Sequence, residues 1–168
     1  MLTNNISIRR LSYSDIPRLA AIANNKNVSD NLRDIFPYPY SEKDAESFIK
    51  NTLEEDPEGT FGIQFNHTLC GVIGLVPQGD VYRLSAELGY WIAQEFWGKG
   101  IATEAVRLIT EYGFQELGLL RIYTGVFEFN EASMKVLEKN GYQKDCIFKK
   151  AMIKNERILD EHRYSITI

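Results

Sequence analysis

The chain has 168 residues, of which 44% are hydrophobic and 25% charged, with a formal net charge of −4. These values are typical of a single soluble globular domain covering residues 1–168, and no apolar run approaches the roughly 18 residues of a membrane helix. The acidic balance disfavours nucleic-acid binding, which needs a basic face. The first residues lack the basic and apolar pattern of a signal peptide, so we expect a cytoplasmic protein outside any membrane.

The first half of the chain is expected to hold four strands and two helices. Ser14 or Asp15 can cap the first helix, and Ser41 caps the second with Asp44 in the capping-box position. Residues 24–30 are expected to form a loop. The strands are expected at residues 6–11, 60–65, 69–76 and 86–92. Because short turns join the later strands, they should run antiparallel.

A glycine turn follows the fourth strand, in the stretch ELGYWIAQEFWGKGIATE at residues 87–104. Apolar residues at steps of three and four continue from it as a helix, which Gly118 is expected to end. N–H groups in the first turn of a helix lack internal partners and carry partial positive charge, so this turn is suited to an anion. Its spacing is neither that of a Walker loop nor GxGxxG, and a mere tight connection is the alternative.

The last third of the chain predicts three more strands and one short helix. The fifth strand, at residues 121–126, follows a helix and should therefore run parallel to the fourth. Asn130 caps the short helix at residues 131–139. The last two strands are expected at residues 142–152 and 158–168. The pattern as a whole predicts one mixed α/β domain.

Metal and disulfide chemistry are not expected. Cys70 and Cys146 lie far apart and form no CxxC pattern, so we expect two reduced, buried thiols. His67 and His162 are isolated, so no metal site is predicted.

Residues 97–102, Trp-Gly-Lys-Gly-Ile-Ala, resemble the [Q/R]xxGx[G/A] acyl-CoA-binding core of the GNAT family of N-acetyltransferases. Gly100 and Ala102 match this pattern, and Trp97 replaces its polar first residue. The longer pattern GYWIxxxxWGKGIATEA is similar to the RimJ/RimL-like branch, and the resemblance covers nearly the whole chain. It implies the GNAT fold, a mostly antiparallel mixed sheet of seven strands with splayed strands 4 and 5 and about four helices.

The resemblance also implies acetyl-CoA as co-substrate. The pantetheine arm would lie between the splayed strands, and main-chain amides of the glycine turn would hold the pyrophosphate. Glu104 would then have to point away from the phosphates. The residues expected to contact acetyl-CoA are Tyr90, Trp91, Ile92, Ala93, Trp97, Gly98, Lys99, Gly100, Ile101, Ala102, Thr103, Asn130 and Ser133.

Transfer to an amine requires that the amine lose a proton and that the departing thiolate gain one. Glu87 is the first candidate base, and an exposed glutamate at a strand end is the alternative. Asp145 is the second candidate, because residues 141–145 resemble the GFxxE stretch of RimL-like enzymes. Leu137 stands where many GNAT enzymes have a tyrosine that protonates the departing thiolate. RimL-like members instead have an NxxS pair, so Ser133, in the pair that begins at Asn130, is expected near the sulfur of CoA.

The acceptor stays open at this point. The resemblance implies direct transfer in a ternary complex to a protein N-terminus or to a small amine such as a polyamine, amino acid or aminoglycoside. A non-catalytic acyl-CoA-binding module is the other hypothesis. Residues 32–40, held extended by two prolines, either wall the acceptor pocket or pack on the core. A monomer and a homodimer are both compatible with the sequence.

Overall fold

Seven strands form one sheet in the order β1-β2-β3-β4-β5-β7-β6 in the computed structural model, which describes residues 5–168. The strands are β1 (Ile6–Arg9), β2 (Thr60–Phe65), β3 (Thr68–Pro77), β4 (Ser85–Ile92), β5 (Arg121–Phe127), β6 (Gln143–Lys154) and β7 (Arg157–Thr167). The predicted directions are confirmed, since β4 and β5 run parallel and the other neighbours run antiparallel.

The helices are α1 (Ile16–Ala23), α2 (Lys26–Ser29), α3 (Glu42–Leu53), α4 (Ile101–Gln115) and α5 (Glu131–Lys139). The prediction of a loop at residues 24–30 is wrong, because α2 lies there and makes a fifth helix. The Asn25 side chain starts this turn by accepting hydrogen bonds from the main-chain N–H groups of Asn27 and Val28. Val28 then anchors the turn, being only 2% exposed. None of these helices is long and apolar enough to cross a membrane.

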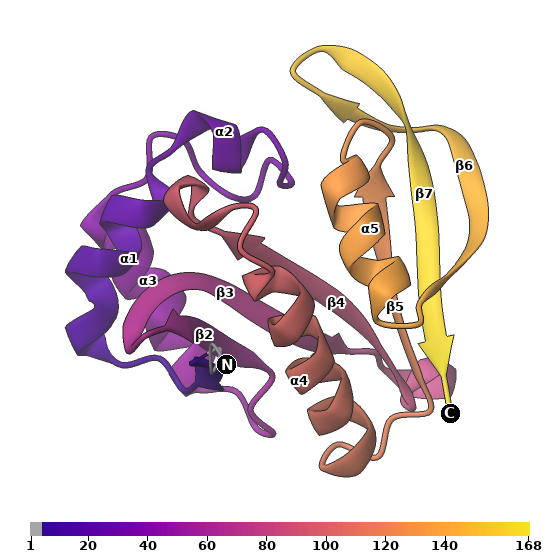
Figure 1. Ribbon diagram of the computed structural model, residues 1–168, viewed down its shortest axis with the longest axis horizontal. Coiled ribbons are helices and arrows are strands. Elements are labelled where there is room, and N and C mark those ends of the chain that lie inside the picture. The colour runs from indigo at the N-terminus through magenta and orange to yellow at the C-terminus, as the bar shows by residue number, and fades with distance from the viewer. Residues whose placement is uncertain (1–4) are drawn as a thin grey trace.

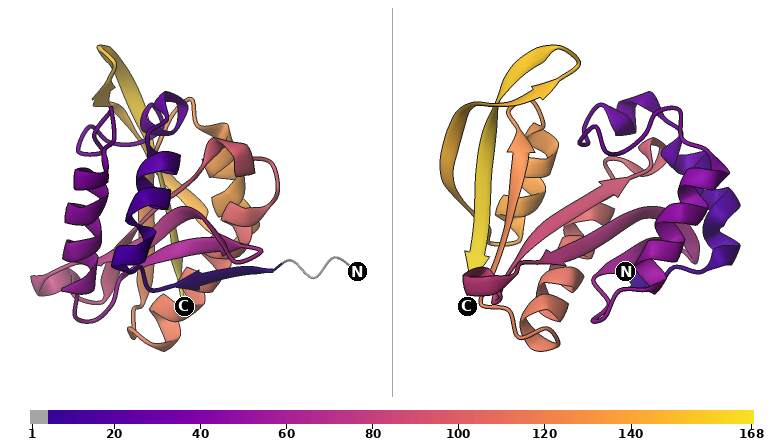
Figure 2. Two further views of the ribbon diagram at one scale, coloured as in Figure 1. Left: turned by 90° about the vertical axis from the view of Figure 1, so that its left-hand side faces the viewer. Right: turned by 180° about the vertical axis from the view of Figure 1, so that it is seen from behind.

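Helices cover both faces of the sheet, and Figure 2 shows α1 and α3 on one side and α4 and α5 on the other. The larger core lies between the sheet and α4 and α5, around Ile73, Leu88 and Ile109. A smaller core lies under α1 and α3, around Leu19, Ile49 and Val72. Burial of these apolar side chains is the main force that holds the helices to the sheet.

The sheet opens between β4 and β5. These strands pair only through Ser85, Ala86 and Glu87, opposite residues 121–123. Beyond this point they diverge, as Figure 1 shows, because β4 stays paired with β3 up to Ile92 and β5 stays paired with β7 up to Phe127. The predicted splay of strands 4 and 5 is therefore confirmed.

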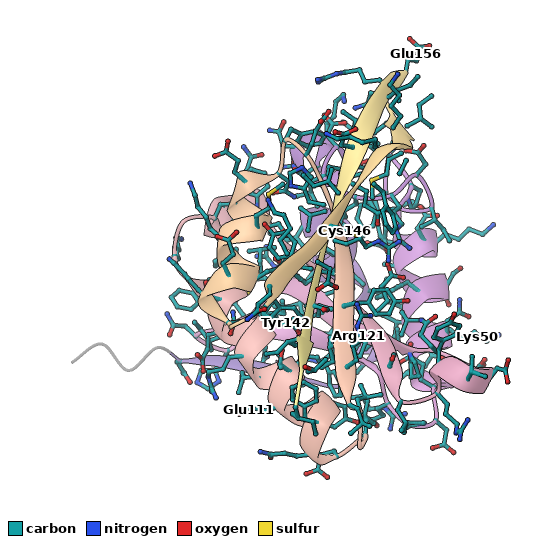
Figure 3. The ribbon with its side chains drawn as sticks, turned by 90° about the vertical axis from the view of Figure 1, so that its right-hand side faces the viewer. Lys50, Glu111, Arg121, Tyr142, Cys146 and Glu156 are labelled. Carbon is teal, nitrogen blue, oxygen red and sulfur yellow. The ribbon has the colours of Figure 1, made fainter. Side chains whose placement is uncertain are left out.

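The two cysteines differ in environment. Cys70 is fully buried in the core, as expected, but the expectation for Cys146 is wrong because its side chain is exposed. Cys146 lies on β6, the edge strand of the sheet, whose outer face no helix covers (Figure 3). No disulfide links the two thiols.

Candidate active site

The turn before α4 exposes a row of main-chain N–H groups. Gly98 and Gly100 both have φ +75°, a left-handed conformation that glycine adopts without strain. The first hydrogen bond of α4 runs from the N–H of Glu104 to the carbonyl of Gly100 at 3.2 Å. Within residues 5–168, no acceptor is found for the N–H groups of residues 98–103. Since no atom lies within 4 Å of a Cβ built at either glycine, side chains do not fill the turn.

A cleft of about 640 Å³ begins at this turn and continues between β4 and α5. We call it the main cleft. The predicted contact residues that line it are Tyr90, Trp91, Ile92, Trp97, Gly98, Lys99, Gly100, Ile101, Ala102, Thr103, Asn130 and Ser133. Ala93 is the exception, because it is buried in the core under α1 and α3. One opening therefore joins the turn to the end of β4 and to α5.

Trp97, which replaces the polar residue of the family motif, has a structural contact of its own. Its indole N–H donates to the carbonyl oxygen of Ile92 at 2.7 Å. That carbonyl lies at the last residue of β4, beyond the stretch that pairs with β5. The indole therefore satisfies a main-chain acceptor at the open end of the wedge and ties the turn to β4.

Tyr90 and Ser133 meet across the wedge. The hydroxyl groups of the two side chains are 2.8 Å apart, and the Tyr90 hydroxyl also donates to the Ser133 carbonyl at 3.4 Å. Burial raises the pKa of Tyr90 to about 12, although the hydrogen bond with Ser133 acts in the opposite direction. Tyr90 is therefore protonated near neutral pH. Asn130 fixes the position of Ser133, because its side-chain oxygen accepts the Ser133 main-chain N–H at 3.1 Å.

Lysine side chains give the main cleft a positive rim. Lys99 lines it from the turn, and Lys135 and Lys139 line it from α5. The Lys99 ammonium group lies 4.9 Å from the centre of the Phe96 ring, in a cation–π contact. Glu131 also lines the cleft, 3.8 Å from the Lys135 ammonium group, so one carboxylate stands against three lysines. The remaining positive charge and the exposed N–H donors make this end of the cleft suited to phosphate groups.

Glu104 does not oppose this charge at close range. Its carboxylate accepts two hydrogen bonds from Arg107, at 2.6 and 3.0 Å. Hydrogen bonding to Arg107 is the largest cause of the lowered pKa of Glu104. Because the partner lies one turn further along α4, the side chain is held away from the N–H groups, as bound phosphates would require.

A second cavity of about 350 Å³ lies on the α3 side of the sheet, and we call it the acceptor-side cavity. Glu87 lines it and forms an ion pair with Arg33 from the segment before α3. Glu87 also belongs to the last residue pair between β4 and β5, so its carboxylate lies where the wedge starts. The residues that line both cavities are Asn31, Leu32, Tyr90, Trp91, Asn130 and Ser133.

Asp145 lies outside both cavities. Its carboxylate pairs with Arg121 at 2.8 Å and accepts the Ser165 hydroxyl at 2.9 Å. Arg121 is at the closed end of the wedge, in the first residue pair of β4 and β5. The structure thus brings Glu87 and Ser133 to a common cavity but does not bring Asp145 there.

Sequence reasoning missed three features of this site. Tyr90 was expected to contact the cofactor only, although its alternation with Leu88 and Ile92 indicates that its hydroxyl faces the helices. The spacing of Lys135 and Lys139 places both on one face of α5, which is a readable signal. The ion pair between Arg33 and Glu87 joins residues 54 positions apart and leaves no local signal.

Within the described residues, no group of three or more His, Cys, Asp or Glu side chains is placed to hold a metal ion. The family of the chain follows from its similarity to known proteins. The chain matches the Acetyltransferase (GNAT) domain family over residues 5–143.

Two relatives from Bacillus subtilis are similar over most of their length. The uncharacterized N-acetyltransferase YoaA is 32% identical, with 98% of this chain and 94% of YoaA covered. The putative ribosomal N-acetyltransferase YdaF is 33% identical, with 84% of this chain and 79% of YdaF covered. The match with YdaF supports the predicted RimJ/RimL-like branch.

A solved structure shares the fold along almost the whole chain. It is the spermidine N-acetyltransferase from Vibrio cholerae in complex with CoA and spermine, with a TM-score of 0.82 and 26% identity. The alignment covers 96% of this chain and 95% of that one. Because the family match spans more than half of the chain and the fold has the splayed strands and glycine turn, this protein belongs to the GNAT family of acetyl-CoA-dependent N-acetyltransferases.

Proposed function

We propose that the main cleft binds acetyl-CoA and that the acetyl group passes directly to a primary amine in the acceptor-side cavity. The observation that carries this proposal is the meeting of the two cavities at Tyr90, Asn130 and Ser133. A donor in one cavity and an acceptor in the other would meet at these shared residues. This arrangement converts a two-molecule reaction into a reaction within one complex.

The residues of the main cleft fit the parts of acetyl-CoA. The N–H groups of residues 98–103 are suited to the pyrophosphate, and Lys135 and Lys139 to further phosphate charge. The open edge of β4 from Tyr90 to Ile92 is suited to the amide groups of an extended arm. When bound, acetyl-CoA would supply an activated thioester.

Two side-chain groups can move the protons. Glu87 Oε1 or Oε2 can take the proton of the attacking amine, directly or through a water molecule, once Arg33 shifts. On the other side, the Tyr90 hydroxyl can donate to Ser133 Oγ, so that the Ser133 hydroxyl proton points toward the departing sulfur. With its pKa raised to about 12, Tyr90 is protonated at neutral pH and can donate this hydrogen bond.

The acceptor is a primary amine, and a protein N-terminus is one candidate. An α-amino group, with a pKa near ~8, loses its proton far more readily than a lysine side chain near ~10.4. Relatives are named for both kinds of acceptor, since YdaF is a putative ribosomal N-acetyltransferase and the Vibrio cholerae structure is a spermidine N-acetyltransferase. A small-molecule amine is therefore the second candidate.

Thiol release from acetyl-CoA, measured with a panel of amines, tests the proposal. We expect Ser133→Ala, Tyr90→Phe and Glu87→Gln each to lower kcat by about a hundredfold, with nearly unchanged CoA affinity. Glu46→Gln removes an exposed α3 carboxylate outside both cavities and should leave kcat unchanged. CoA binding without turnover on any amine would instead support a non-catalytic acyl-CoA-binding module.

A further inference from the structure

The walls of the acceptor-side cavity are mainly apolar. Its apolar lining residues include Leu32, Phe36, Phe48, Val72, Trp91 and Met152. Phe36 supports this wall by packing its ring edge-on against Trp91 at 5.6 Å. A cavity of about 350 Å³ holds on the order of ten water-sized groups, so one small molecule or one N-terminal side chain fills it.

Charge is scarce in this cavity and already balanced. Among its described lining residues, only Arg33 and Glu87 are charged, and they are paired with each other. The Glu87 side chain is 21% exposed and that of Arg33 is 61% exposed, so the guanidinium group lies nearer to solvent. An approaching ligand therefore meets the positive member of the pair first.

The neighbouring carboxylates on the segment before α3 are also paired. Asp34 contacts Lys154 at 2.8 Å, and the Lys154 side chain is only 6% exposed. Asp30 contacts Lys26 at 2.7 Å and accepts a hydrogen bond from Asn155 at 3.0 Å. These contacts tie the segment to the tip of the β6–β7 hairpin and leave neither carboxylate unpartnered.

A further carboxylate lies behind the cavity wall. Gly125 lines the cavity, and a Cβ built on it would lie 1.9 Å from Glu161 Oε1. The Glu161 side chain is only 7% exposed and pairs with Arg163 at 2.7 Å. This charge is therefore also matched and almost closed off from solvent.

We infer that the acceptor is a primary amine borne on an apolar aliphatic or aromatic body with no second cationic centre; this rests on the proposed function of the site. The apolar walls stabilise such a body by removing it from water. A second ammonium group would lie beside Arg33 or would be buried without a counter-charge, and both are unfavourable. The single reactive amine needs one carboxylate, which Glu87 provides.

Hexylamine and 1,6-diaminohexane form a matched pair of probes, because they have the same chain length and differ in one terminal ammonium group. We expect kcat/KM for hexylamine to exceed that for 1,6-diaminohexane by about tenfold. Calorimetric titration of each amine into the CoA-saturated protein gives a readout independent of turnover and should show the same preference. Spermidine should be a worse acceptor than either.

Arg33 is the residue that should set this preference. Arg33→Gln should bring the two amines to within about twofold of each other, and Arg33→Glu should reverse the order. Arg10→Gln is the matched control, since Arg10 is 52% exposed, pairs with Glu58 and lies outside both cavities. This control should keep the tenfold preference.

A peptide with an N-terminal phenylalanine, compared with hexylamine, distinguishes the two sources of such an amine. Acetylation of the phenylalanine peptide in preference to hexylamine assigns the cavity to a protein N-terminus, and the opposite result assigns it to a free amine. Preference for 1,6-diaminohexane or spermidine by a protein that binds CoA would overturn the inference and leave the proposed function standing. Absence of both CoA binding and turnover would instead refute the proposed function.

Discussion

Substitution of Gly100 by alanine should affect both the stability of the protein and its affinity for CoA, and the two effects can be measured separately. With φ +75°, a residue other than glycine costs about 1–2 kcal/mol at this position. No atom lies within 4 Å of the added methyl group, so no clash increases this cost. For a domain of this size we expect Tm to fall by roughly 2–8 °C.

The effect of Gly100→Ala on cofactor binding should be larger than its effect on stability. The methyl group would lie beside the N–H groups of residues 98–103, where a phosphate must approach. Loss of one charge-assisted hydrogen bond, worth about 1.5–3 kcal/mol, corresponds to an increase in the Kd for CoA of about ten- to a hundredfold. Isothermal titration with CoA measures this Kd, and the rise in Tm on adding CoA gives a second reading.

Gly118→Ala is the control for backbone strain. Gly118 has φ +62°, has no atom within 4 Å of its built Cβ and lines neither cavity. It should therefore show a similar loss of stability with an unchanged Kd for CoA. Equal weakening of CoA binding by both substitutions, or wild-type binding by Gly100→Ala, would refute the assignment of the turn to phosphate.

Three further predictions concern individual contacts. The Asp15 carboxylate accepts hydrogen bonds from the guanidinium group of Arg9 on β1, at 2.6 and 2.8 Å. These bonds lower the pKa of Asp15. The ionised Asp15 carboxylate stabilises the fold above the ordinary carboxyl pKa of ~3.9. This contribution to the free energy of unfolding is lost as the pH falls through the lowered pKa of Asp15. Urea titrations should thus find Asp15→Asn less stable by about 1–3 kcal/mol at pH 7, and a gap that does not shrink as the pH is lowered below the ordinary carboxyl pKa would contradict this. Trp97→Phe removes the 2.7 Å hydrogen bond to β4 and should cost about 1 kcal/mol, so an unchanged urea midpoint would argue that this bond contributes nothing. A thiol reagent should label Cys146 rapidly and Cys70 slowly, because burial raises the pKa of Cys70 to about 11; two rapidly labelled thiols would show that the core is open.

The parts of the fold that the sequence predicts are those with local signals. The reciprocal capping bonds of Ser41 and Asp44 are present, and the strand, glycine turn and helix at residues 86–115 lie as expected. In contrast, α2 is only four residues long, too short for a hydrophobic period, and its start depends on the side chain of Asn25. Exposure of Cys146 was missed because it depends on which strand lies at the sheet edge.

The candidate site was predictable in its main-chain part and less so in its side-chain part. The glycine turn depends on consecutive residues, whereas Tyr90 and Ser133 are 43 positions apart and meet only through the packing of α5 on the sheet. Glu87 is a candidate base because of its place on β4, but its partner Arg33 comes from a segment whose conformation the sequence does not encode in any regular pattern. Contacts of this kind become visible only with the tertiary structure.

The wedge between β4 and β5 is held open from both sides. β3 pairs with β4 along its length, and Gly71 permits the close approach, since a Cβ there would lie 2.2 Å from the carbonyl oxygen of Trp91. β7 pairs with all of β5, so neither strand can turn toward the other without losing existing hydrogen bonds. Main-chain groups on the facing edges therefore need partners from water or from a ligand, apart from the Ile92 carbonyl that Trp97 satisfies. A slot with open amide edges favours a ligand that has amide groups of its own, which supports the proposal that the pantetheine arm of acetyl-CoA binds there.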